Sequence, residues 1–166
     1  MTVLENQIRI DAPPEKVWSV LASLDALAEY DPGVAKSEIV SDTKQGPGAA
    51  RRCDLAPGGW FKERVAAWHP NESLSFELYE CTLPVRALRH SYTLVPDGGG
   101  TLVSQRMEYR LKFGPLGKLL DAVIVRRKWN AGIHGFFAGL KRYVESGGRR
   151  GRVLGQPGEH LVEGGG

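Results

Sequence analysis

Hydrophobic and polar residues alternate with a period of two over most of the chain up to residue 112, and this pattern predicts β-strands. The alternation is clean from Gln7 and predicts a first strand over residues 2–10. Six more strands are expected, separated by turn-forming residues such as the run Asp97-Gly98-Gly99-Gly100. They cover residues 34–41, 49–55, 60–68, 74–81, 87–95 and 101–112.

The last of these strands shows the pattern most clearly. One face carries Val103, Gln105, Met107, Tyr109 and Leu111, and the other carries Ser104, Arg106, Glu108, Arg110 and Lys112. A strand with one apolar and one charged face is typical of an antiparallel sheet that is covered on one side only.

Helical periodicity follows the first strand and the last. Asp11 and the prolines after it favour the start of a short helix over residues 14–23, and a second short helix is expected over residues 25–28. Gly114-Pro115 then opens a long helix from residue 116 to about residue 145. Its apolar stripe comprises Leu119, Val123, Ile133, Phe137, Leu140 and Val144, with Arg126 and Asn130 interrupting it.

These elements predict an α+β protein with the order β-α-α-β6-α, in which a curved antiparallel sheet of about seven strands wraps around the long C-terminal helix. That helix is the only predicted element large enough to cover the apolar face of the sheet. We expect its C-terminal part to pack on the sheet and its earlier part to stand off and form the wall of a cavity.

Composition adds limits to this picture. A chain of 166 residues favours one domain, which we place at residues 1–146, followed by a flexible Gly- and Arg-rich tail over residues 147–166. The net charge of +3 is small and most Lys and Arg residues are scattered, so no nucleic acid partner is expected. No segment has the pattern of a signal peptide or a membrane span, and Cys53 and Cys81 give no disulfide framework, so we expect a cytoplasmic protein.

Several short motifs occur in a characteristic order. They are Ile10-Asp11-Ala12-Pro13-Pro14-Glu15-Lys16-Val17-Trp18, then Glu63-Arg64-Val65 before Trp68-His69-Pro70, then Asp97-Gly98-Gly99-Gly100-Thr101, and finally Gly114-Pro115-Leu116-Gly117 leading to Leu140-Lys141-Arg142-Tyr143-Val144-Glu145. The ordered set resembles the START-like (SRPBCC) helix-grip superfamily, in particular its polyketide cyclase/dehydrase and lipid-transport branch. The resemblance covers residues 3 to about 146 and implies a ligand cavity between the concave face of the sheet and the long helix. It implies no shared catalytic motif, because one fold hosts many functions.

The usual enzyme motifs are absent from the sequence. It contains no Gly-x-Ser-x-Gly, no Gly-rich phosphate loop and no dinucleotide-binding fingerprint after a strand. The four histidines lack metal-ligand spacing with one another or with a cysteine, so we expect neither a metal nor a cofactor.

Polar residues on apolar faces are candidate ligand contacts, because an unpaired buried polar group costs a few kcal/mol. With their apolar neighbours, the strand candidates for ligand binding are Glu63, Phe76, His90, Tyr92, Gln105, Met107 and Tyr109. The candidates elsewhere are Trp18, Tyr30, Val123, Arg126 and Asn130. Each has a structural alternative: Glu63 could pair with an arginine in the sheet, Arg126 could extend into solvent, and Trp18 could belong to the core.

Three classes of function remain open. The first is a protein that binds a small hydrophobic molecule such as a lipid, quinone, polyketide or aromatic compound in the cavity. The second is a polyketide cyclase, aromatase or dehydratase, with His90 as acid or base and Arg126 stabilising an enolate. A hydrogen-bonded pair inside the cavity, such as His90 with Glu63 or Tyr109, would favour the enzyme. The third is an interaction module, which the basic run Arg126-Arg127-Lys128 would suit.

Overall fold

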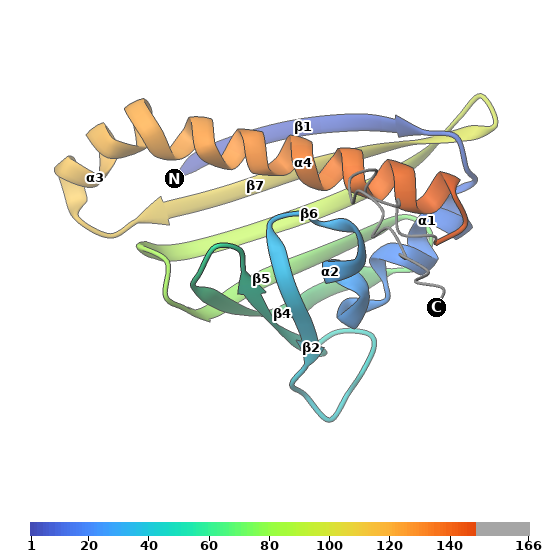
Figure 1. The fold of residues 1–166 in the computed structure, drawn as a ribbon, viewed down its shortest axis with the longest axis horizontal. Helices are drawn as coiled ribbons and strands as arrows, with labels where there is room; N and C mark the ends of the chain where they lie inside the picture. Colours follow the sequence, from blue (N-terminus) through green and yellow to red (C-terminus); the bar gives the residue numbers. More distant parts are fainter. Residues whose placement is uncertain (149–166) are drawn as a thin grey trace, which may run out of the picture.

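The computed structural model describes residues 1–148, and all seven predicted strands form one antiparallel sheet in it (Figure 1). They are β1 (Thr2–Ile10), β2 (Val34–Ile39), β3 (Ala50–Leu55), β4 (Trp60–His69), β5 (Ser73–Cys81), β6 (Val85–Asp97) and β7 (Gly100–Leu111). Their order in the sheet is β1-β7-β6-β5-β4-β3-β2. The sheet is therefore a meander from β2 to β7, with β1 added beside β7.

The helices also follow the predicted order. The first connection contains α1 (Pro14–Leu21), a 3₁₀ turn η1 (Leu24–Ala26) and α2 (Leu27–Tyr30). The C-terminal helical segment consists of α3 (Gly114–Leu120), a π-helical turn η2 (Asp121–Val125) and α4 (Arg126–Glu145). Figure 1 shows α4 running across the face around which the strands curve. The predicted α+β helix-grip fold is thus confirmed.

The start of α1 differs from the sequence expectation. Asp11 does not cap α1, because Pro13 occupies the N-cap position and no side chain donates or accepts a capping hydrogen bond there. The side chain of Asp11 pairs instead with Arg9, and its backbone N–H donates to Glu145 Oε1 over 2.9 Å. This last bond attaches the C-terminal end of α4 to the end of β1.

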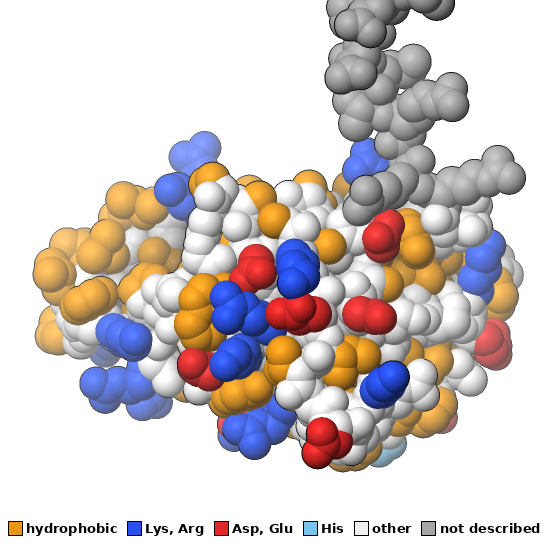
Figure 2. All heavy atoms as spheres, turned by 60° about the horizontal axis from the view of Figure 1, so that its bottom comes forward, with side chains coloured by type: hydrophobic (Ala, Val, Ile, Leu, Met, Phe, Trp, Pro, Cys, Tyr) orange, Lys and Arg blue, Asp and Glu red, His pale blue; other side chains and the backbone are white. Residues whose placement is uncertain are grey.

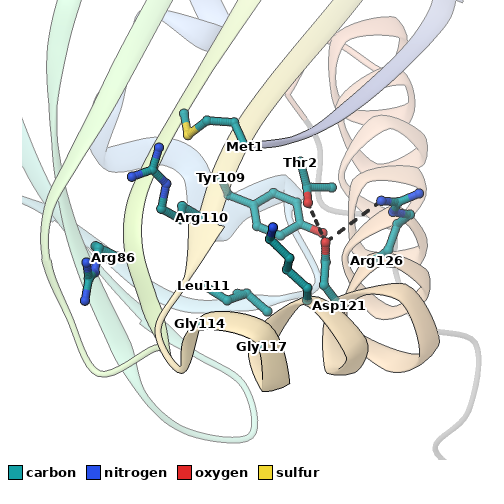
Figure 3. Close-up of a pocket in the computed structure, with 11 residues that line it drawn as sticks. Met1, Thr2, Arg86, Tyr109, Arg110, Leu111, Gly114, Gly117, Asp121 and Arg126 are labelled. Carbon is teal, nitrogen blue, oxygen red and sulfur yellow. Dashed lines mark hydrogen bonds and ion pairs between the residues drawn. The ribbon is translucent and has the colours of Figure 1, made fainter.

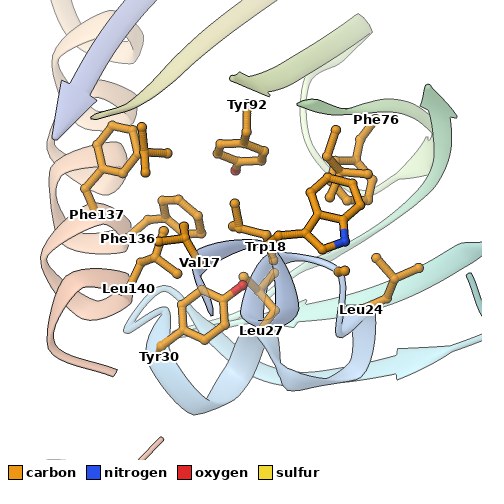
Figure 4. Packing of buried hydrophobic residues seen from close by; sticks show 14 of the residues in the cluster. Val17, Trp18, Leu24, Leu27, Tyr30, Phe76, Tyr92, Phe136, Phe137 and Leu140 are labelled. Carbon is orange, nitrogen blue, oxygen red and sulfur yellow. The ribbon is translucent and has the colours of Figure 1, made fainter. Parts of the chain in front are cut away.

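The core lies between the concave face of the sheet and the helices α1, α2 and α4 (Figure 4). From α4 it receives Ile133, Phe136, Phe137, Leu140 and Val144, all buried. The C-terminal part of the predicted stripe is therefore confirmed. The expectation that the earlier part forms a cavity wall is wrong for Leu119 and Val123, which are exposed. The π-helical turn directs Asp121 toward β1 and β7 in their place, where it hydrogen-bonds with Thr2 and Tyr109.

Within residues 1–148, no helix is both long and apolar enough to cross a membrane. The flexible tail predicted for residues 147–166 lies, except for Gly147 and Gly148, outside the described residues.

Close contact between α2 and α4 requires a glycine. A Cβ atom built on Gly139 would lie only 1.8 Å from the carbonyl oxygen of Tyr30, well inside van der Waals contact. Gly132, seven residues earlier on the same helix, has no atom within 4 Å of the equivalent position. The two glycines therefore have different roles, although both lower helix propensity.

We predict opposite effects of alanine at these two positions. Gly139→Ala forces α2 and α4 apart and should lower the free energy of unfolding by about 2 kcal/mol or more. Gly132→Ala meets no clash and should raise it by up to about 1 kcal/mol through helix propensity. Urea denaturation of both variants checks this, and a destabilisation of equal size at both positions would contradict the packing described.

Candidate functional site

A row of polar groups crosses the inner face of the sheet through an otherwise apolar core. Arg51 on β3 and Glu63 on β4 are directly opposite each other in the strand register. Arg51 Nε donates to Glu63 Oε1 over 2.8 Å, and Arg51 Nη2 lies 2.7 Å from the same oxygen. The other carboxylate oxygen, Oε2, lies 2.7 Å from Nε2 of His90 on β6. We call Arg51, Glu63 and His90 the polar triad; their exposed fractions are 4%, 1% and 8%.

The triad is enclosed by further contacts. Arg51 Nη1 donates to the carbonyl oxygen of Leu24 over 3.3 Å, and its guanidinium carbon lies 4.6 Å from the centre of the Phe76 ring. The His90 ring stacks on that same ring, with centroids 5.0 Å apart and planes inclined by 19°. The edge of Tyr92 meets His90 with a centroid separation of 5.4 Å. The triad is therefore held rigidly from several sides.

Beside the triad, Gln105 on β7 and Tyr92 on β6 form a second polar pair. They are cross-strand neighbours, and Gln105 Nε2 donates to Tyr92 Oη over 3.1 Å. The Tyr92 ring also contacts Phe136 of α4, with centroids 5.4 Å apart. This pair thus connects the polar part of the sheet to the helix that covers it.

Two buried polar atoms of this region have no hydrogen-bond partner among the described residues: His90 Nδ1 and Gln105 Oε1. Because the Glu63 carboxylate can only accept, His90 Nε2 carries the hydrogen in their bond. In the neutral ring Nδ1 is then an acceptor, and the amide oxygen of Gln105 is also an acceptor. Both atoms therefore lack a donor, a condition that buried polar groups rarely show without a ligand or water.

A cavity of about 230 Å³ lies beside these atoms, between the concave face of the sheet and α4. Its position agrees with the one that the family resemblance implies. Its lining residues are Leu27, Asp31, Gly33, Val34, Arg51, Leu55, Phe61, Glu63, His90, Tyr92, Gln105, Met107, Trp129, Gly132, Ile133 and Phe136. Most of the lining is apolar, and its polar side chains are those of the polar triad, Gln105, Tyr92 and Asp31.

Electrostatics keep Glu63 and Arg51 in their charged forms. Burial alone would raise the pKa of Glu63, but the adjacent His90 and Arg51 outweigh it and lower that pKa to about 2. Burial disfavours the charge on Arg51, yet Glu63 keeps the pKa of the guanidinium above its ordinary value. By contrast, burial raises the pKa of the nearby Cys53 thiol to about 11, so this cysteine is not a thiolate nucleophile at neutral pH.

The structure brings five of the twelve predicted ligand-binding residues to the cavity: Glu63, His90, Tyr92, Gln105 and Met107. Their contact with a ligand stays a prediction. The pairing of Glu63 with an arginine, foreseen as its structural alternative, is confirmed. His90 and Glu63 also form the hydrogen-bonded pair that was expected of an enzyme.

Three other candidates are buried close by but do not line the cavity. Trp18 packs against Trp68, with ring centroids 5.0 Å apart, and so belongs to the core beneath α1. Tyr30 lies between α2 and α4 against Phe136. Phe76 supports His90 from behind by stacking. Neighbouring aromatic rings separate these three residues from the cavity, and their contact with a ligand stays a prediction.

The remaining four candidates lie toward the other end of the helical segment. Tyr109 and Arg126 line a separate hollow of about 530 Å³ beside α3, where Asp121 hydrogen-bonds with Tyr109 and lies 3.9 Å from Arg126 (Figure 3). Val123 is exposed. The Asn130 Oδ1 atom accepts a hydrogen bond from Asn6 Nδ2 over 3.0 Å. The two catalytic candidates, His90 and Arg126, therefore line different hollows, and Arg51 is the cation that lines the cavity with His90.

Arg51 is the main polar residue of the cavity that the sequence alone did not identify. Alternation within the strand places Arg51 and Cys53 on the same face, and Cys53 is completely buried. Arg51 therefore points to the inner face, where it is opposite Glu63 on the next strand. This placement was the signal that could have identified it. Among residues 1–148, no group of three or more His, Cys, Asp or Glu side chains could hold a metal ion.

Comparison with known proteins agrees with this architecture. The sequence profile of the family described as "Polyketide cyclase / dehydrase and lipid transport" matches residues 1–145. A search of curated proteins gave no match.

Solved structures extend the comparison at the level of the fold. A protein of Thermus thermophilus has a TM-score of 0.76 and 21% identity, covering 89% of this chain and 100% of its own. A START superfamily protein from Mycobacterium smegmatis has a TM-score of 0.72 and 16% identity, covering 87% of this chain and 97% of its own. A Chromobacterium violaceum protein has a TM-score of 0.65 and 20% identity, covering 86% of this chain and 96% of its own. At such identities the likeness concerns the fold alone.

The triad predicts a specific dependence of stability on pH. Glu63→Gln leaves Arg51 buried without its counter-charge and should lower the free energy of unfolding at pH 7 by about 3 kcal/mol or more. The folded-state pKa of Glu63 is lowered from 4.5 to about 2, so its stabilising effect is complete above pH 4.5 and is lost as the pH falls toward 2. The difference between wild type and variant should therefore narrow over this range.

Urea denaturation at neutral pH and at about pH 3 measures that difference. Glu5→Gln is the control, because Glu5 forms an exposed ion pair with Arg106 and its replacement should change stability by less than about 1 kcal/mol. A difference for Glu63→Gln that is constant or grows on acidification would refute the assigned pairing.

Proposed function

The chain belongs to the polyketide cyclase/dehydrase and lipid transport family, and from this premise we propose that it binds a small, mainly apolar molecule between the sheet and α4. The observation that carries the proposal is the pair of buried acceptors, His90 Nδ1 and Gln105 Oε1, beside an apolar cavity. Apolar sites use a few such groups to orient their ligands. The polar end of the ligand would supply the missing donors.

The volume of the cavity and its free acceptors limit the chemistry of the ligand. A cavity of about 230 Å³ is below the range of about 300–1,000 Å³ that is usual for small-molecule sites. It suits one or two fused rings, or a chain of similar volume, better than a complete two-chain lipid. A hydroxyl, phenol, enol or N–H group at one end would donate to the free acceptors, while the rest of the molecule contacts Met107, Trp129 and Ile133.

Matched probes test the predicted donor. We expect 2-naphthol to bind about tenfold more tightly than 2-methoxynaphthalene, which has the same rings but no donor, because a buried acceptor without a partner is unfavourable. Gln105→Leu should reduce this preference, whereas Gln7→Leu, at an exposed position on β1, should leave it unchanged. Isothermal titration calorimetry provides the affinities.

Native mass spectrometry and the two probes also define the result that would contradict the binding proposal. Native mass spectrometry of protein purified from its host should detect a bound small molecule. If none is detected, and neither probe binds with saturation, the cavity does not serve as a ligand site.

A second candidate function is acid–base catalysis on such a molecule. The specific observation in its favour is the 2.7 Å contact between His90 and Glu63 inside the cavity. Glu63 orients the ring by accepting from Nε2–H, which leaves Nδ1 to take a proton from a carbon next to a carbonyl group. This is the first step of a cyclase or dehydratase reaction, and the Arg51 charge balances that of Glu63 during it.

Proton abstraction can be measured without the natural substrate. In heavy water, an enzyme of this kind should accelerate deuterium exchange at the α-carbons of 2-tetralone by about 100-fold or more, as followed by NMR. His90→Phe keeps the stacking on Phe76 and should remove the acceleration, while Gln105 still accepts from the ligand, so that binding is weakened but retained. Arg126→Gln should have no effect, because Arg126 lies in the other hollow. Exchange at the buffer rate with wild-type protein would exclude the catalytic candidate and leave the binding proposal intact.

A further inference from the structure

The start of the C-terminal helical segment carries an exposed apolar surface that neither the core nor the cavity uses. Six of the eleven exposed large hydrophobic side chains in residues 1–148 lie between residues 113 and 124. They are Phe113, Leu116, Leu119, Leu120, Val123 and Ile124, with exposed fractions between 41% and 65%. We call these six residues the α3 stripe. Single exposed apolar residues are ordinary, but a contiguous group marks an interaction surface.

The stripe is held outward by contacts on the opposite side of the helix. Asp121 is buried and hydrogen-bonds with Tyr109 of β7 and Thr2 of β1 (Figure 3). Gly117 is also buried, and a Cβ atom there would lie 2.4 Å from the carbonyl oxygen of Lys112. These contacts fix the side of the helix that faces the sheet. The stripe therefore points away from the protein as a consequence of specific bonds.

Positive charge surrounds the stripe. Residues 110–128 contain six of the 22 Lys and Arg residues of a chain whose net charge is only +3. They are Arg110, Lys112, Lys118, Arg126, Arg127 and Lys128, and all six are exposed. The one acidic residue in this range, Asp121, is buried. Figure 2 shows hydrophobic side chains gathered at the end where α3 lies in Figure 1, with Lys and Arg next to them.

We propose that the α3 stripe and its flanking cations dock the protein onto an anionic lipid surface. An amphipathic helix with apolar side chains on one face and Lys or Arg around them is the arrangement that lies in the interface of a bilayer. The apolar side chains enter the acyl boundary, and the cations contact the negatively charged headgroups. The helix lies on the membrane and does not cross it, in agreement with the lengths and hydropathy of the described helices.

Charge favours this partner over the two others that such a surface suggests. In a two-fold dimer the stripe would meet itself, and the six cations of each copy would come together without acidic partners. A nucleic acid would satisfy the cations but would leave the six apolar side chains in water. An anionic bilayer satisfies both features, and the proposal does not depend on a ligand in the cavity.

Vesicle co-sedimentation tests the proposal. The wild-type protein should sediment with phosphatidylcholine vesicles that contain phosphatidylglycerol, should bind pure phosphatidylcholine vesicles more weakly, and should be released by added salt. Leu119→Ser with Val123→Ser should reduce binding to the anionic vesicles by about tenfold. Arg127→Gln with Lys128→Gln should give a reduction of similar size. All four positions are exposed, so the fold should be unaffected.

Matched controls separate this surface from the rest of the protein. Val40→Ser with Val95→Ser removes two exposed apolar residues elsewhere, and Lys16→Gln with Lys44→Gln removes two exposed cations elsewhere; both pairs should bind like wild type. Absence of binding to anionic vesicles would overturn the proposal. So would binding that the stripe variant leaves unchanged, or a dimer, seen by analytical ultracentrifugation, that the stripe variant converts to monomer. Salt-sensitive binding to duplex DNA that needs the cations but not the stripe would assign the surface to nucleic acid instead.

Discussion

The buried carboxylate of Glu63 is the group on which the inner face of the sheet depends. It lies 2.7 Å both from a nitrogen of Arg51 and from one of His90, and so connects β3, β4 and β6 on the inner face. A charge in an apolar interior is tolerated only when it is paired and hydrogen-bonded. This requirement fixes the register of β3 against β4, because a shift by one residue would turn Arg51 or Glu63 to the outer face. The hydrogen bond between Glu63 and Nε2 of His90 leaves Nδ1 as the nitrogen of that ring without a partner.

The covering helix adapts to this polar region by packing unevenly along its length. At Gly139 the helix backbone approaches the Tyr30 carbonyl so closely that a methyl group would not fit. Between Trp129 and Phe136, by contrast, the helix side chains line a cavity and do not fill it. If apolar side chains of the helix packed directly on His90 and Gln105, the acceptors His90 Nδ1 and Gln105 Oε1 would have no possible donor. A cavity that admits a molecule with donor groups is the arrangement that can satisfy them.

The sequence was sufficient for the fold and for about half of the site, for physical reasons. Strict alternation identifies which side of each strand faces inward, and five cavity residues followed from that rule alone. Alternation places Arg51 on the inner face but does not identify its partner Glu63, twelve residues away in the sequence, so the ion pair inside the cavity was not assigned to Arg51. The predicted apolar stripe of the helix was wrong at Leu119 and Val123, because the prediction assumed a regular period of 3.6 residues. The π-helical turn at Asp121 changes that period and turns the stripe outward.

The C-terminal helical segment therefore contains two apolar surfaces with different orientations. Ile133, Phe136, Phe137, Leu140 and Val144 are buried against the sheet, whereas the large apolar residues before Val125 face outward. Asp121 causes the change, because its bonds with Tyr109 and Thr2 occupy the position that an apolar residue of a continuous stripe would take. An exposed apolar face gives up the stabilisation that burial would bring. Trp129, four residues after the π turn ends, lines the cavity, so one continuous helical segment carries both the outward face and a wall of the cavity.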